Sequence, residues 1–305
     1  MKVESAAERE IQMIEAEAPR RRLRQLEVMV AERIVETHDT TTLVLFAGNE
    51  PLDYEAGNFL TIDPHQFKAL DRFTRFLEDL KGKREPPRAY SLASAPYERH
   101  LAITIKEEPY TSGQTKYPPL LSPLLVHRMP VGARMVITGF TGPFTLPKDP
   151  EGRIEHIVHI CAGSGVVPSY SILKQDLVMG SRLRHTLIFS NKTRQDVIYG
   201  RHLQALAEKH PERFTYVQTL TRELDGSVFG PQVRRGRISR ELITELVPDP
   251  GSAHFMVCGP GITTFERREA KARGEEPQPR FLETAVKYLK ELGVDRKRIS
   301  QEAYG

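Results

Sequence analysis

Hydrophobic residues form three successive patterns along the 305-residue chain. Residues 1–27 are rich in Glu, Arg and Ala, with loosely helical apolar spacing and a break at Pro19, which predicts an N-terminal helical arm. From residue 28 to 150, short β-branched and aromatic runs alternate with Gly, Pro and Asn, as in an antiparallel barrel. We predict strands at 28–34, 40–46, 58–62, 89–93, 101–106 and 133–138.

One segment of this first domain lacks the strand pattern. Apolar residues recur at helical spacing from His65 to Arg84, and Gly82 followed by Pro86 predicts where the helix ends. We therefore predict an inserted amphipathic helix near 65–84 that packs its apolar face on the barrel. The alternative is that this face covers a cofactor or contacts a partner. The apolar positions are Phe67, Leu70, Phe73, Phe76, Leu77 and Leu80.

From 151 to 305, strand-like runs alternate with helical patterns, which predicts a parallel sheet with helices on its faces. The charged, proline-containing segment 266–280 is predicted to be a surface loop. The predicted fold is thus a six-stranded antiparallel barrel followed by a Rossmann-like α/β domain. The strands expected in the second domain are 154–162, 185–190, 214–220 and 254–258.

Composition narrows the function classes. No run approaches the roughly 18 apolar residues of a membrane span, and the charged N-terminus lacks an apolar signal region, so we expect a cytoplasmic protein. The two cysteines are too few for a typical iron-sulfur cluster with four thiolates. The net charge of +4 favours an acidic partner, although a solvated basic face is the simpler interpretation. No aromatic platform accompanies the arginines of residues 20–24, which disfavours nucleic-acid binding.

A glycine turn follows the first strand of the second domain. Gly163 and Gly165 lack Cβ atoms that would keep a pyrophosphate away, Ser164 lies between them, and Pro168 suits the first turn of a helix. The helix N-terminus then favours an anion. This pattern predicts a dinucleotide site, although Pro168 stands where the usual fingerprint has its third glycine and a simple turn is the alternative.

The end of the next strand bears on the choice of coenzyme. Ser190, Lys192 and Arg194 could hold a 2′-phosphate, and no carboxylate immediately follows the strand to accept a ribose hydroxyl. We therefore favour NADPH mildly over NADH. Asp196 keeps NADH open, and a solvated polar loop is the alternative.

The strand around residue 90 carries a second candidate constellation. Arg88 and Tyr90 should share one face, while Ser91 points to the other. An arginine can pair with a flavin pyrophosphate, a tyrosine can stack on the ring or ribityl chain, and a serine can approach the flavin N5 edge.

These segments, taken in order, resemble the ferredoxin-NADP reductase superfamily over residues 28–305. Matching segments include Arg88 to Ser91, Gly163 to Pro168 and Cys258 to Pro260. The resemblance implies an FAD-binding barrel and a nicotinamide nucleotide-binding second domain. Further matches are 57–60, before the flavin signature, 122–125, at the flavin pyrophosphate, and 142–144, at the barrel end. The cofactor residues implied are Arg88, Ala89, Tyr90, Ser91, Ile105, Lys106, Ser122, Leu124, Gly163, Ser164, Gly165, Pro168, Ser190, Lys192, Arg194, Cys258, Gly259, Pro260 and Tyr304.

The C-terminus strengthens the resemblance. Glu302, Ala303 and Tyr304 resemble the plant-type ending Glu-x-Tyr, in which the tyrosine ring covers the flavin and the glutamate supports the active-site serine. Gly305 follows the tyrosine here, whereas the family's tyrosine is the last residue. A frayed tail is the alternative interpretation.

The resemblance implies an NAD(P)H oxidoreductase that passes electrons through FAD to a one-electron acceptor protein such as ferredoxin, flavodoxin or an oxygenase component. The implied catalytic residues are Ser91, Cys258, Glu302 and Tyr304, with Cys258 shaping the nicotinamide pocket by contact. A flavin-carrying docking subunit and a free flavin reductase are the alternatives.

No metal site is expected, because His156 and His159 should point to opposite faces of their strand. Cys161 and Cys258 should both lie at carboxyl ends of parallel strands, close enough to form a thiol pair.

Overall fold

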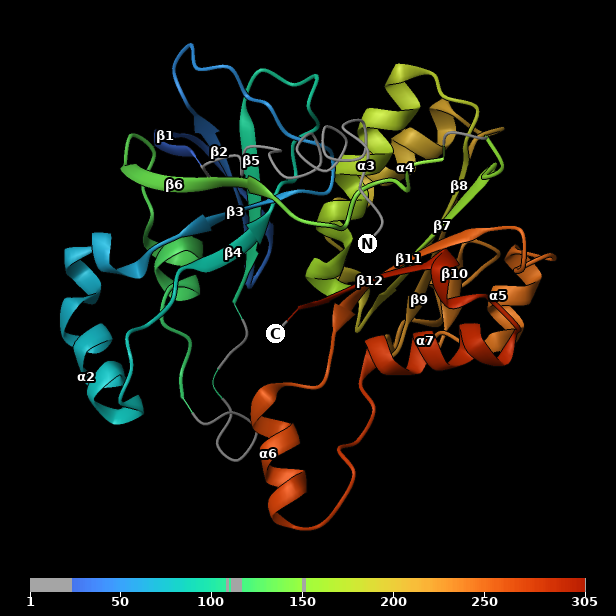
Figure 1. Ribbon diagram of the computed structural model, residues 1–305. Coiled ribbons are helices and arrows are strands. Elements are labelled where there is room, and N and C mark those ends of the chain that lie inside the picture. Colours follow the sequence, from blue (N-terminus) through green and yellow to red (C-terminus); the bar gives the residue numbers. More distant parts are fainter. Residues whose placement is uncertain (1–23, 108–109, 111–116, 150–151, 305) are drawn as a thin grey trace, which may run out of the picture.

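The computed structural model describes residues 24–107, 110, 117–149 and 152–304, which form two sheet domains (Figure 1). The first is a six-stranded antiparallel sheet in the order β4-β3-β6-β1-β2-β5. A bridge between Leu92 and Ile103 joins the β4 end to β5 and closes the barrel. Its strands are β1 (Arg24–Thr37), β2 (Thr40–Phe46), β3 (Phe59–Ile62), β4 (Arg88–Ser91), β5 (Leu101–Lys106) and β6 (Arg134–Thr141).

Alternation of side chains builds the barrel core. Leu26, Val28 and Val30 are buried on one face of β1, and Leu43 and Leu45 meet them from β2. Because successive strand residues point to opposite faces, the same pattern that predicted the strands also places these side chains inside. The antiparallel barrel is confirmed.

The N-terminal boundary differs from the prediction. Strand β1 begins at Arg24, so residues 24–27 belong to the barrel instead of the helical arm assigned to 1–27. Residues 24–29 pair with β6, and this pairing extends the strand toward the N-terminus, past the apolar run that begins at residue 28. Residues 1–23 of the predicted arm lie outside the described part of the chain.

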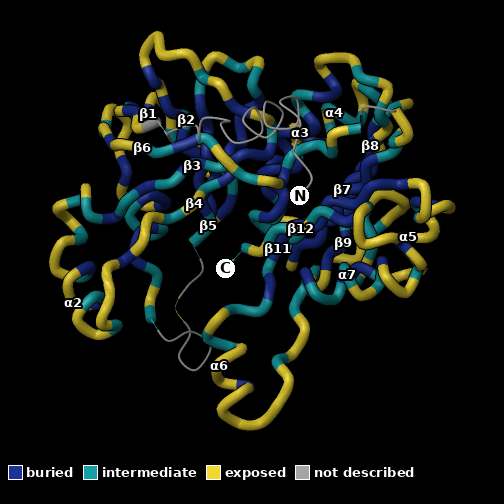
Figure 2. The backbone as a smooth tube through the Cα atoms, viewed as in Figure 1, coloured by how far each residue is buried: buried dark blue, intermediate teal, exposed yellow. Residues whose placement is uncertain are grey.

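The inserted helix is shorter than its apolar pattern. Helix α2 spans Asp71–Lys81, and two 3-10 turns, 64–66 and 68–70, precede it. Leu77 is buried, but the side chains of Phe76 and Leu80 are 58% and 55% exposed. The apolar face therefore packs only in part on the barrel, and Figure 2 shows much of α2 facing solvent.

The second domain is a parallel six-stranded sheet in the order β10-β9-β8-β7-β11-β12. Helices α3 and α4 pack on one face, while α5 and α7 pack on the other. The predicted α/β architecture is confirmed. The elements are β7 (His156–Ala162), α3 (Val166–Met179), β8 (Arg184–Asn191), α4 (Gly200–Lys209), β9 (Phe214–Leu220), β10 (Val233–Arg235), α5 (Arg240–Leu246), β11 (His254–Pro260), α6 (Thr264–Ala272), α7 (Phe281–Glu291) and β12 (Ile299–Tyr304).

The surface loop predicted at 266–280 is wrong in its first half. Residues 264–272 form α6, which projects from the domain between β11 and α7 (Figure 1). Thr263 and Glu266 form a capping box: the Thr263 Oγ1 accepts from the Glu266 N–H at 3.1 Å, and Glu266 accepts from the Thr263 N–H at 2.7 Å. The dense charge that suggested a loop is the solvated surface of this helix.

Direct contacts fix the two domains against each other. The Ser171 hydroxyl of α3 donates to the Ser94 carbonyl at 2.6 Å, and the Lys174 ammonium contacts Glu98 at 2.6 Å. Tyr199 shares a further hydrogen bond with Thr104 of β5. These contacts hold the carboxyl edge of the parallel sheet against the barrel. In the described ranges no helix is long and apolar enough to cross a membrane.

Candidate functional site

The glycine turn after β7 lies at the carboxyl edge of the parallel sheet. Gly163 has φ +53°, and the space where its Cβ would lie is open. A Cβ on Gly165, in contrast, would lie 2.3 Å from the Cys258 carbonyl oxygen. Gly165 thus has a packing reason of its own to lack a side chain, and the pyrophosphate role predicted for both glycines stays a prediction. Pro168 is buried in the first turn of α3, as expected.

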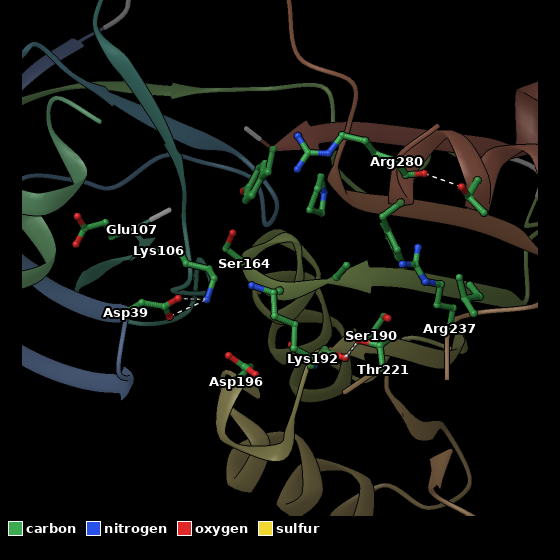
Figure 3. A pocket seen from close by; sticks show the side chains of 18 of the residues that line it. Asp39, Lys106, Glu107, Ser164, Ser190, Lys192, Asp196, Thr221, Arg237 and Arg280 are labelled. Carbon is green, nitrogen blue, oxygen red and sulfur yellow. Dashed lines mark hydrogen bonds and ion pairs between the residues drawn. The ribbon is translucent and has the colours of Figure 1, made fainter. Parts of the chain in front are cut away.

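A pocket of about 450 Å³ opens beside this turn (Figure 3). Asp39 and Lys106 reach it from the barrel, whereas Lys192 and Arg237 reach it from the second domain. Residues from both domains therefore enclose one space. Of the predicted site residues, those lining it are Lys106, Gly163, Ser164, Ser190, Lys192, Pro260 and Tyr304.

Some charged side chains in this pocket are already paired within the protein, and others are not. Lys106 contacts Asp39 at 2.7 Å, and the Asp196 carboxylate accepts from the Thr193 N–H at 2.9 Å. Lys192 and Arg237 have no side-chain hydrogen bond or ion pair within the described ranges, so their donors remain available to a phosphate. Arg194, a predicted phosphate ligand, is exposed and does not line the pocket.

Sequence reasoning missed Arg237, Arg280 and Phe281. Arg280 contacts Glu266 at 3.5 Å, and Phe281 packs so near Gly259 that a Cβ there would lie 2.7 Å from its ring. No motif surrounds these residues, and Arg280 fell within the predicted loop. The fold brings them to the pocket: the start of α7 places Arg280 and Phe281 near the carboxyl ends of β7 and β11, and Arg237 follows β10.

A second cleft, of about 890 Å³, lies along the barrel. Arg88, Tyr90 and Ser122, three of the predicted flavin residues, line it together. Arg88 donates to the Pro86 carbonyl at 2.7 Å and to buried Glu85 at 2.5 Å. Residues just before β4 therefore fix the Arg88 side chain at the cleft before any ligand binds.

Not every predicted flavin residue lines this cleft: Ala89, Ser91, Ile105, Lys106, Leu124 and Tyr304 do not. Ile105 is buried in the barrel core, Ala89 is exposed on β4, and Leu124 packs against the core at the start of a π-helical turn, Leu124–Arg128. Their suggested contacts with a flavin stay predictions.

Tyr304 lies where the two domains meet. Strand β12 pairs in parallel with β11, placing Tyr304 opposite Pro260 and Glu302 opposite Cys258. The Tyr304 hydroxyl donates to the Ser91 Oγ at the end of β4. The last residues that the structure describes are therefore an ordered strand and not a frayed tail.

Glu302 lies beside this contact. Its Oε2 is buried and has no hydrogen-bond partner in the described chain, so the carboxyl does not contact Ser91 through that atom. Burial raises the pKa of Glu302 from 4.5 to about 7. A carboxyl of this kind can hold or release a proton near neutral pH.

The raised pKa predicts a pH-dependent effect of Glu302→Gln. The unfolded chain ionises this carboxyl above about pH 4.5, whereas the folded chain resists ionisation until about pH 7. In the wild type, ionising the buried Glu302 lowers the free energy of unfolding. This loss is absent below about pH 4.5, grows between about pH 4.5 and 7, and is complete above that range. Relative to wild type, the variant should gain unfolding free energy as pH rises. Urea titrations at about pH 4, 6 and 8 measure this difference, and a constant difference would contradict the prediction.

The two cysteines are register partners on adjacent strands β7 and β11, and both thiols are free and buried. Burial raises the pKa of Cys161 to about 12 and raises the pKa of Cys258 well above its usual value. Both are therefore neutral thiols and poor nucleophiles, which agrees with a contact role for Cys258.

His159 contacts Ser169 and His185, while His156 contacts Thr186. Within the described ranges no group of three potential ligands could hold a metal ion.

Comparisons with known proteins agree with this arrangement. Residues 159–267 match the oxidoreductase NAD-binding domain family. The ferredoxin reductase component of 3-ketosteroid-9-alpha-monooxygenase from Rhodococcus rhodochrous is 26% identical over 92% of this chain and 65% of its own length. Across the first relatives, the chain spans between 46% and 65% of the curated protein's length.

Solved structures share the fold. The FAD/NAD-binding domain of a nitric oxide dioxygenase from Vibrio cholerae superposes with a TM-score of 0.67 at 23% identity, covering 93% of this chain and all of that one. Ferredoxin-NADP+ reductase from Plasmodium falciparum gives 0.62 at 15% identity, covering 92% and 96%. Both domains and their relative placement therefore have known counterparts.

Proposed function

We propose that this chain, which has the two-domain fold of the ferredoxin-NADP reductase-like flavin reductases and an oxidoreductase NAD-binding domain, is an NAD(P)H-dependent flavoprotein reductase. One observation carries the proposal: Tyr304 lines the nucleotide pocket and also donates to Ser91, the residue after the flavin-cleft residues Arg88 and Tyr90. Two ligands bound in these spaces would meet at this tyrosine.

The residues at both spaces fit the two ligands. In the cleft, Arg88 and Ser122 offer donors to phosphates, and Tyr90 offers an aromatic face. In the pocket, Gly163 leaves room for a phosphate at the N-terminal side of α3. A bound flavin would supply the conversion of a two-electron donation into single-electron steps. FAD is favoured over FMN.

The chain's own residues would position and protect the reacting groups. Tyr304 would cover a bound flavin ring until a nicotinamide displaced it, and buried Cys258 would shape the space behind by contact. Ser91 would offer its hydroxyl to the N5 edge of the flavin, and Glu302 could exchange a proton near neutral pH. Holding the reacting atoms within about 3 to 3.5 Å is the main contribution of such a site.

We propose an acidic one-electron protein as the acceptor, in the cytoplasm. The relatives named as ferredoxin reductase components support a protein acceptor, and the net charge of +4 suits an acidic one. Ferredoxin, flavodoxin and an oxygenase component all fit this description.

The absorption spectrum of the purified protein tests the proposal. A flavin spectrum that bleaches on anaerobic addition of NADPH or NADH is the expected result. A protein that stays colourless after incubation with FAD would contradict it. Bleaching only when free flavin is supplied and turned over would instead identify a free flavin reductase.

The exposed side chains of Phe76 and Leu80 on α2 favour a second candidate, a flavin-carrying docking subunit. Such a protein would bind flavin and copurify with a stoichiometric partner, yet show little NAD(P)H-dependent dye reduction alone. Rapid dye reduction by the isolated chain would exclude it.

The charged residues of the pocket predict which side chain distinguishes NADPH from NADH. Arg237→Ala should weaken NADPH about tenfold more than NADH, because a charged hydrogen bond to the 2′-phosphate is lost. Arg194→Ala, outside the pocket lining, serves as the matched control and should discriminate little. Dissociation constants for both coenzymes measure this, and a larger effect at Arg194 would restore the strand-end motif as the phosphate site.

A further inference from the structure

Helix α6 forms part of the wall of the predicted flavin cleft, although it belongs to the second domain. Thr263, Phe265 and Arg268 line the same 890 Å³ cleft as Arg88 and Tyr90. Leu80 and Lys81 of α2 line it as well. The cleft thus extends from the barrel strand β4 to a gap between two helices, one from each domain.

The outer part of the cleft is rich in available positive charge. Lys81 and Arg88 both pair with buried Glu85, which leaves that trio with one net positive charge. Lys83 and Arg268 line the cleft without a side-chain ion pair or hydrogen bond in the described chain. Lys81 also lies 4.6 Å from the centre of the Tyr117 ring. Phosphate and a flat aromatic ring match these surroundings.

The order of groups along the cleft identifies the part of the ligand concerned. Ser91, at the end of β4, contacts Tyr304, so a flavin ring that meets a nicotinamide would lie toward that end of the strand. Arg88, three residues before Ser91, and Ser122 suit the first phosphates, and Lys83 precedes Arg88 by five further residues while lining the same cleft. A dinucleotide flavin carries an adenosine beyond its first phosphate, whereas FMN ends at that phosphate.

Helix α6 is anchored well enough to act as a wall. Its capping box fixes the first turn, and Ala270 buries its side chain. Arg280, at the start of α7, contacts Glu266 at 3.5 Å and donates to the Gly261 carbonyl at 3.4 Å. Through these contacts Arg280, which follows the α6 segment, is held against Gly261 and Glu266, which lie at its start.

We infer that α6 binds the adenosine-phosphate half of FAD, with Phe265 against the adenosine and Arg268 toward phosphate, so that both domains hold the flavin. The inference rests on the proposed function, since it needs a flavin in the cleft. It assigns a ligand role to a charged helix that the sequence alone presented as a surface loop.

Fluorescence titration of the flavin-free full-length chain with FAD and with FMN tests the inference. Arg268→Ala should weaken FAD binding about threefold to fivefold, as expected for an exposed charge pair. Phe265→Leu keeps an apolar side chain but loses the flat ring, and should weaken FAD about tenfold. FMN binding should be unchanged in both variants.

Lys271→Ala is the matched control, because Lys271 is an exposed cation of the same helix that does not line the cleft. Equal FAD affinity in all three variants would overturn the inference, as would equal weakening in all three. An equal loss for FMN and FAD would also overturn it, because α6 would then act on the part that the two share. If the wild-type chain binds neither flavin, the proposed function itself fails.

Discussion

Replacing Tyr304 by serine should raise the affinity for NADP+ or NAD+ by about tenfold, the free-energy equivalent of one displaced aromatic contact. The half-buried ring packs against the apolar cluster that contains Cys258, and its hydroxyl donates to Ser91. A nicotinamide can reach the flavin face only if it displaces this ring. In the wild type, the free energy needed to displace Tyr304 therefore weakens coenzyme binding, and the serine variant lacks this cost.

Difference spectra of the oxidised protein titrated with coenzyme measure the change. Tyr304→Phe is the control, because it keeps the ring but removes the hydroxyl that donates to Ser91. If the ring is the obstacle, the phenylalanine variant should bind coenzyme much like wild type. Unchanged affinity in Tyr304→Ser would mean that Tyr304 does not stack where the nicotinamide binds.

Short, mostly buried strands were the most predictable elements. The ranges 40–46, 101–106 and 214–220 coincide with β2, β5 and β9, because each is a compact apolar run bounded by polar or turn-forming residues. The short strand β10, Val233–Arg235, was missed since three residues carry no periodic signal. Helix α6 was missed for another reason: its stability depends on a capping box and one buried alanine, while charged residues dominate its sequence.

Site residues were predictable where a short sequence motif identifies them. Gly163 stood out through its turn and Tyr304 through its terminal motif, and the structure places both at one pocket. Arg237 reaches that pocket from the connection between β10 and α5, and Phe281 reaches it from the start of α7. Their role depends on the order of strands in the sheet, which no local pattern encodes. The structure adds a second reason for glycine at 165, which no local pattern showed: a side chain there would collide with the Cys258 carbonyl.

Ser91→Val should slow reduction of the bound flavin by about 100-fold, the typical cost of removing one hydrogen-bond donor that stabilises developing charge. Ser91 is buried at the end of β4 and accepts from the Tyr304 hydroxyl. That contact leaves the serine proton free to point toward a flavin in the adjoining cleft. Valine is larger than serine but nearly isosteric with threonine, so comparing Ser91→Val with Ser91→Thr separates loss of the donor from the effect of added bulk.

Stopped-flow reduction by NADPH under anaerobic conditions measures the rate, and the flavin content of the purified variant reports binding. Ser91→Thr is the matched control: it restores a hydroxyl on the same branched side chain and should recover much of the rate. Tyr304→Phe removes the other partner of the hydrogen bond, so a large loss in that variant as well would assign the effect to the Ser91–Tyr304 contact. A normal rate in Ser91→Val would remove Ser91 from the chemistry and leave it a packing residue of the barrel.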